Sequence, residues 1–223
     1  MNPEAVGEPL ADLPAGRAGG EARGLRWLNA LPAEQASKEL LACCGSAAWA
    51  ARVAAARPFA DAAALAATAA QVWDSLTPHD WLQGFAAHPR IGARASGGGA
   101  GGPGQAAGGP RPDPGASGRR GPGASGPGPG ASRADPGASW SRAEQARVGD
   151  ADPGVMAALA AGNLAYERRF GHVFLIFASG RSAEDLLAAL HQRLDNDPEV
   201  ELRAAAAEQR KITALRLDKL LRQ

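Results

Sequence analysis

The sequence contains very little cysteine: Cys43 and Cys44 are the only two among 223 residues. Because neighbouring residues on a helix point in different directions, these two make poor disulfide partners. Free thiols are typical of proteins from a reducing compartment. We therefore expect a cytoplasmic location.

Long apolar stretches and targeting signals are also missing. No apolar run approaches the roughly 20 residues that a membrane-spanning helix needs. The N-terminus has neither a basic start nor an apolar core, and the final Leu-Arg-Gln is not a peroxisomal signal. These absences predict a chain with no signal peptide and no membrane partner.

The chain has no excess of charge of either sign. It carries 24 basic and 23 acidic side chains, for a formal net charge of +1. The segments with helical patterns contain no dense stripe of lysine and arginine, which is the usual mark of a nucleic-acid-binding surface. The composition therefore argues against a nucleic-acid partner.

Common catalytic and ligand-binding motifs are absent as well. The sequence has no P-loop, no glycine fingerprint after a strand, no G-x-S-x-G and no C-x-x-C. The four histidines, at 79, 88, 172 and 191, form no i, i+4 pair. A zinc site would need ligands from distant segments, so we predict no metal.

Glycine and proline, by contrast, are abundant and unevenly spread. Most of the 29 glycines and 17 prolines lie in residues 1–23 and 95–139. Residues 1–23 are mostly small and polar, which predicts a flexible N-terminal tail. Residues 95–139 lack apolar anchors, which predicts a disordered, low-complexity insert in one loop. The remainder of residues 24–223 is roughly 160 residues, a normal size for one domain with its own core.

Helical patterns dominate this remainder, which predicts an all-α fold. Pro32 suits the first position of a helix, whose apolar stripe is predicted as Ala36, Leu40, Leu41 and Cys44. Residues 173–177 form a short β-branched and aromatic run, predicted to be extended and buried. Other starts and stops are expected at Ser46, Asp61, Thr77-Pro78, Asp152-Pro153, Ser182, Asp197-Pro198, Gly45 and Gly171.

Three local features have both a structural and a functional interpretation. His88-Pro89 follows a helix, where a histidine is either a helix cap or an acid–base group. Ser141-x-x-Glu144 has the pattern of a capping box, and a helix N-terminus is also a good anion site. Arg216 lies on the stripe of the last helix, and its side chain either reaches the surface or binds a planar polar ligand.

Together these features occur in an order that resembles the OHCU (2-oxo-4-hydroxy-4-carboxy-5-ureidoimidazoline) decarboxylase family. The resemblance covers residues 25–94 and 140–221. It is carried by Leu28-Asn29-x-Leu31-Pro32, Cys44-Gly45-Ser46, Arg57-Pro58-Phe59, His88-Pro89-Arg90-Ile91-Gly92, Trp140-Ser141-x-x-Glu144-Gln145, Tyr166-Glu167-x-x-Phe170-Gly171 and Lys211-Ile212-x-x-Leu215-Arg216-Leu217. The long insert departs from the short loop of most members.

The resemblance implies an all-α, cofactor-free carboxy-lyase that makes (S)-allantoin in urate breakdown, with a small-molecule substrate and a homodimeric state. His88 matches the catalytic acid–base group, and Glu144 is the second candidate for proton transfer. The matching substrate-binding residues are Pro89, Ser141, Gln145, Phe174, Leu175, Ile176, Phe177, Ala178 and Arg216.

Three alternatives stay open at this point. The chain is a related enzyme that acts on another ureido or hydantoin-like ring, or a non-catalytic interaction protein that uses the Gly/Pro-rich insert to recruit partners. The third alternative is a structural helical domain whose capping boxes mimic a site.

Overall fold

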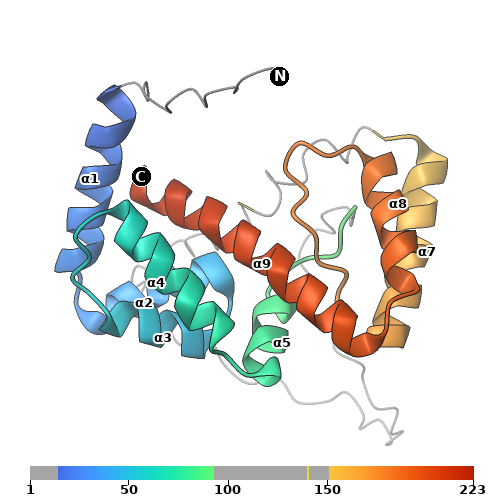
Figure 1. Ribbon diagram of the computed structural model, residues 1–223. Helices are drawn as coiled ribbons and strands as arrows, with labels where there is room; N and C mark the ends of the chain where they lie inside the picture. Colours follow the sequence, from blue (N-terminus) through green and yellow to red (C-terminus); the bar gives the residue numbers. More distant parts are fainter. Residues whose placement is uncertain (1–14, 93–139, 141–150) are drawn as a thin grey trace, which may run out of the picture.

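The computed structural model describes residues 15–92, 140 and 151–223, so the predicted insert 95–139 and Ser141, Glu144 and Gln145 lie outside the described residues. The described residues contain eight helices and no strand (Figure 1), which confirms the all-α prediction. The helices are α1 (Ala15–Ala30), α2 (Ala33–Cys44), α3 (Ala47–Ala55), α4 (Ala62–Asp74), α5 (Pro78–Ala86), α7 (Pro153–Phe170), α8 (Ala183–Leu194) and α9 (Pro198–Leu221).

Most helix ends lie where local residue chemistry predicts them. The Ser46 and Asp61 side chains cap α3 and α4, and Thr77 and Ser182 each form a capping box with an aspartate three residues on. The stops at Gly45 and Gly171 have φ values of 81° and 75°, which favour glycine. Pro32 differs slightly, because it is the N-cap of α2 rather than its first residue.

The prediction of a flexible tail over residues 1–23 is wrong from residue 15 onward, because α1 begins at Ala15. Leu25 and Leu28 of α1 are buried in the core, and α1 packs against α9. This packing stabilises a helix that the glycines at 19, 20 and 24 disfavour. The predicted stripe of α2 needs a smaller correction, since Leu41 is 40% exposed and Cys43 is buried in its place.

The long helix α9 is the element on which the others assemble. It contacts α1, α2, α4, α5 and α7, and Figure 1 shows the first five helices on one side and the α7–α8 pair near its N-terminal end. One apolar core lies among α1–α5 and α9, and a second lies between α7 and α8. The loop after α5 and the segment between α7 and α8 meet where these two parts join.

The close approach of α1 and α9 gives a prediction about two glycines of α1. A Cβ at Gly24 would lie 2.0 Å from the Leu221 carbonyl oxygen, whereas a Cβ at Gly20 would meet nothing within 4 Å. We expect Gly24→Ala to lower the free energy of unfolding by about 1–3 kcal/mol, because the helices must separate. The control Gly20→Ala should raise it by about 0.5–1 kcal/mol through helix propensity. Equal effects in urea denaturation would contradict this packing.

Candidate functional site

The first wall of the site is the loop that follows α5. Its start is held by a hydrogen bond of 3.0 Å from the His88 amide to the Phe85 carbonyl. Further along, Arg90 makes a two-pronged ion pair with Glu167 of α7, with N–O distances of 2.6 and 2.7 Å. Asn163 of α7 donates its side-chain amide to the Ile91 carbonyl at 3.0 Å. The histidine–proline loop is therefore tied to α7 at two points.

The second wall is the segment of residues 174–178 between α7 and α8. It forms no helix or strand, and only Phe177 is not fully buried. Of the predicted run 173–177, Val173 and Phe177 are partly buried and the other three residues are buried. Arg193 of α8 donates to the Leu175 carbonyl at 2.6 Å. The amide of Phe177 donates to the Glu208 carboxylate of α9 at 2.7 Å. Two helices thus hold the backbone of this segment in place.

A buried polar cluster fixes Arg193 in turn. Its guanidinium pairs with the wholly buried Glu201 carboxylate, which also accepts hydrogen bonds from the Tyr166 hydroxyl and the Asn196 side chain. Burial, followed by the hydrogen bond to Glu201, raises the pKa of Tyr166, so its hydroxyl stays protonated as a donor. Because buried charges must be paired, this cluster fixes how α7, α8 and α9 meet.

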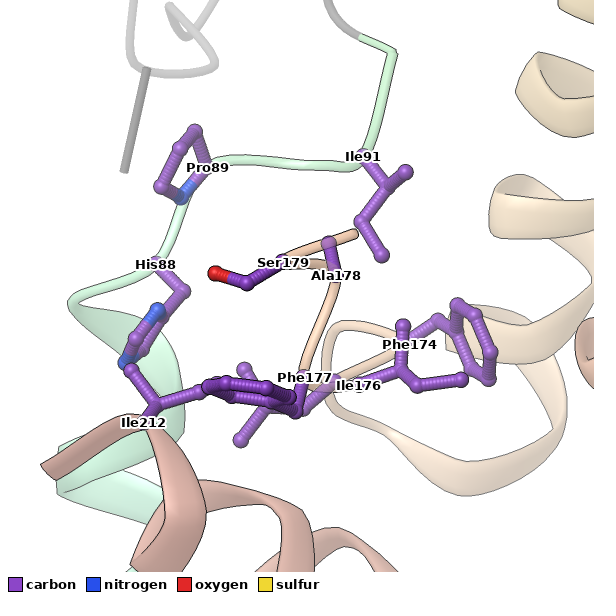
Figure 2. A pocket seen from close by; sticks show the side chains of 10 residues that line it. His88, Pro89, Ile91, Phe174, Ile176, Phe177, Ala178, Ser179 and Ile212 are labelled. Atoms are coloured by element: carbon purple, nitrogen blue, oxygen red, sulfur yellow. The ribbon is translucent and has the colours of Figure 1, made fainter. Parts of the chain in front are cut away.

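The two walls enclose a small pocket with part of α9 (Figure 2). His88, Pro89 and Ile91 come from the loop, the segment from Phe174 to Ser179 faces them, and Ile212 closes the end. The structure therefore brings together seven predicted site residues, at positions 88, 89 and 174–178. Sequence reasoning missed Ile91, Ser179 and Ile212, although Ile91 lies within the histidine–proline motif.

Arg216 is buried, with 2% of its surface exposed. The structural interpretation of this residue as one that reaches the surface is therefore wrong. Its guanidinium lowers the pKa of His88, which indicates that the two groups lie near each other, although Arg216 does not line the pocket wall. The remaining predicted site residues, Ser141, Glu144 and Gln145, lie outside the described residues.

The imidazole of His88 is neutral at physiological pH. Burial, followed by the nearby Arg216 charge, lowers the pKa of His88 to about 3, and the Gln209 side chain opposes this only weakly. The Nε2 atom of the ring is buried and has no hydrogen-bond partner. A neutral imidazole has a lone pair that can accept a proton, but a pKa of about 3 makes it a weaker base at pH 7 than an ordinary histidine.

This depressed pKa predicts a pH-dependent stability. The unfolded chain takes up a proton on His88 near its usual pKa of 6.5, but the folded protein does so only near 3. The contribution of His88 to the free energy of unfolding is therefore fully present above about pH 6.5. Below that pH it is lost, by up to about 1.4 kcal/mol per pH unit. We expect His88→Asn to show a shallower decline in urea denaturation between about pH 7 and pH 4. Parallel curves for the two proteins would contradict the buried, neutral histidine.

Among the described residues, no group of three or more histidine, cysteine or carboxylate side chains could hold a metal ion. The two cysteines, Cys43 and Cys44, are free and buried, and burial raises the pKa of each thiol.

None of the described helices is long and apolar enough to cross a bilayer.

Fold and site together define a small helical domain with a neutral histidine in the wall of a small pocket. The family model described as OHCU decarboxylase matches residues 29–106 and 126–218. The chain belongs to this family.

Individual proteins agree with this assignment. The chain is 32% identical over 180 residues to the uric acid degradation bifunctional protein TTL of Arabidopsis thaliana, covering 80% of this chain and 45% of that protein. It is 37% identical over 83 residues to a 2-oxo-4-hydroxy-4-carboxy-5-ureidoimidazoline decarboxylase of Amia calva, covering 36% of this chain and 47% of that protein. The chain thus spans about half the length of the curated relatives it matches.

Solved structures show the same architecture. A crystal structure of OHCU decarboxylase in the presence of (S)-allantoin matches with a TM-score of 0.58 and 28% identity, over 83% of this chain and 98% of that one. A crystal structure of (S)-allantoin synthase matches with a TM-score of 0.54 and 16% identity, over 88% of this chain and 53% of that one. The second match supports the fold alone.

Proposed function

We propose that this chain decarboxylates 2-oxo-4-hydroxy-4-carboxy-5-ureidoimidazoline to (S)-allantoin without a cofactor. The observation that carries the proposal is the neutral His88 in a pocket wall, opposite the fixed backbone of residues 174–178. A base and an array of backbone donors and acceptors are the two parts that proton exchange on an amide-rich ring requires. The family assignment supports the choice of ring.

The substrate supplies its own electron sink, so no cofactor has to provide one. The bond between C4 and the carboxylate breaks, and its electrons form a C4=C5 double bond while the ring C=N takes up a proton at nitrogen. The 4-hydroxyl then loses its proton as the C4 carbonyl forms, and C5 gains a proton. One proton is consumed overall, CO2 leaves, and the face on which C5 is protonated sets the handedness of allantoin.

In this scheme His88 accepts the proton of the 4-hydroxyl. We assign the stabilisation of the carboxylate, and of the enolate that follows it, to the guanidinium of Arg216, which is buried and acts on the pKa of His88. Backbone groups of residues 174–178 bind the ureido and ring amides, and Pro89 borders the same space. Ser141, Glu144 and Gln145 are assigned to substrate binding, with Glu144 as the second candidate for proton transfer, by their match to the family motif.

The pocket must open for the substrate to enter. Its volume is about 20 Å³, and a cavity of that size holds about one water molecule. A ureidoimidazoline is several times larger, so wall side chains have to move. Phe177 is the only member of residues 174–178 that is not fully buried, and we assign this movement to its ring.

The test follows the circular dichroism of allantoin as it forms from freshly generated ureidoimidazoline, with and without the purified protein. We expect one optically active enantiomer to appear faster than in the spontaneous reaction. A trace identical to spontaneous decay would contradict the activity. Faster turnover of simple hydantoins than of the ureidoimidazoline would favour the related-enzyme alternative.

The finer parts of the proposal concern location, partners and assembly. We infer a cytoplasmic enzyme from the two free thiols, with a small-molecule substrate and a homodimeric state. Near-normal decarboxylation after deletion of residues 95–139 is expected, whereas the interaction-protein alternative requires that this deletion destroys function. Sedimentation analysis of the purified chain tests the dimer.

A further inference from the structure

Three buried side-chain atoms among the described residues lack a hydrogen-bond partner, Asn163 Oδ1 and two others that complement each other chemically. One is His88 Nε2, and the other is Oε1 of Gln209 on α9. The Gln209 side chain is wholly buried on α9, about one turn before Ile212, which lines the same pocket as His88. The Gln209 side chain also raises the pKa of His88. A buried carbonyl oxygen without a donor costs free energy, so a ring N–H directed at it would be stabilising.

The orientation of the Gln209 amide is set by its nitrogen. Nε2 of Gln209 donates to the Cys44 carbonyl at 3.3 Å and to the Thr213 hydroxyl at 3.1 Å. Rotating the amide by half a turn would place Oε1 against the Cys44 carbonyl oxygen, where two acceptors repel each other. The glutamine therefore offers His88 an acceptor and not a donor.

We propose that Gln209 is a positioning residue whose side-chain carbonyl accepts the Nε2–H of His88 and so leaves Nδ1 as the nitrogen that exchanges a proton with the substrate. The role in the reaction rests on the proposed function, but the tautomer does not. The hydrogen bond that one ring nitrogen makes determines which nitrogen carries the proton. It also stabilises the imidazolium that forms when Nδ1 takes up a proton, because Nε2–H is then a stronger donor.

The first experiment measures the ¹⁵N shifts of His88 in the full-length protein at neutral pH, without substrate, with His88→Asn to assign its signals. We expect a protonated Nε2 with a hydrogen-bonded proton and an unprotonated Nδ1. In Gln209→Met that proton should lose its hydrogen-bonded shift. A wild-type ring protonated at Nδ1, or an unchanged Nε2–H signal in Gln209→Met, would overturn the proposal.

Kinetics then separate positioning from a merely structural role. Gln209→Met should lower kcat by about tenfold or more and leave KM nearly unchanged, since acid–base catalysis contributes typically 10²–10⁴-fold. Gln209→Glu restores an acceptor, so it should recover part of kcat and move the acid limb of the pH profile upward. Similar losses and unshifted profiles in both variants would overturn the proposal.

Asn29 provides the matched control. Its side-chain amide also makes two hydrogen bonds, to the Phe59 carbonyl at 2.9 Å and from the Phe59 amide at 3.0 Å, and it lies away from the pocket. We expect Asn29→Leu to be destabilised while its His88 shifts and pH profile stay those of the wild type. If wild-type protein has the expected tautomer but no decarboxylase activity, the proposed function fails and the hydrogen bond stands.

Discussion

Replacing His88 by alanine is expected to abolish enzyme-dependent turnover while the fold stays intact. The imidazole lies in the pocket wall, and the loop that carries it is held on α7 through Arg90 and Asn163, so its loss removes the base without detaching the loop. We expect kcat to fall by about 10²–10⁴-fold, the usual contribution of a general acid–base group. Circular dichroism of the forming allantoin measures the loss, and far-ultraviolet spectra check the helices.

His191→Ala is the matched control, because His191 is exposed on α8 and does not line the pocket. It should retain normal turnover and stability. His172 is less suitable, since its ring packs against Phe85 and Tyr166 with centroid distances of 5.3 and 5.4 Å. Normal activity in purified His88→Ala would remove this histidine from the mechanism.

The second large effect is expected at the buried ion pair of Arg193 and Glu201. Arg193→Met leaves the Glu201 carboxylate uncompensated in a site where none of its surface is exposed. Breaking one partner of such a pair costs about 3–5 kcal/mol. The Leu175 carbonyl also loses its donor, so the backbone of the second pocket wall is released. Urea denaturation measures the stability loss, and we expect KM to rise in any protein that still folds.

Arg203→Met is the control for this prediction. Arg203 also pairs with a glutamate, Glu199, but the two side chains are 71% and 73% exposed. Exposed pairs of this kind contribute only about 0.3–0.5 kcal/mol. Arg193→Lys keeps the positive charge but not the several donors of the guanidinium, so its loss of stability should be intermediate. Equal losses of stability for Arg193→Met and Arg203→Met would contradict the prediction that Arg193→Met leaves Glu201 as a buried, unpaired charge.

Helix boundaries were the most predictable part of this protein. Caps such as Ser46, Asp61 and Ser182 act within three residues of themselves, so the chain around them contains the whole interaction. The start of α1 was not predictable in this way. Its glycines disfavour a helix locally, and the contacts that stabilise it come from the far end of the chain.

The polar residues of α9 show a second limit. Glu201, Gln209 and Arg216 are all buried, although on a surface helix such side chains normally face water. Gln209 precedes Arg216 by seven residues, two helical turns, so it shares a face with the arginine that the family motif marks. That spacing was a usable signal for Gln209, but only once this face was known to be buried.

The sequence by itself determined most of the helices after α1, through caps, stops and apolar periodicity, and it indicated the family, through the order of short motifs. Only the tertiary structure decided that residues 88, 174–178 and 212 meet in one pocket, because contacts across such separations depend on how helices pack. It also decided the charge state of His88. Burial and the neighbouring Arg216 set that pKa, and both arise only when the loop after α5 is packed against α9.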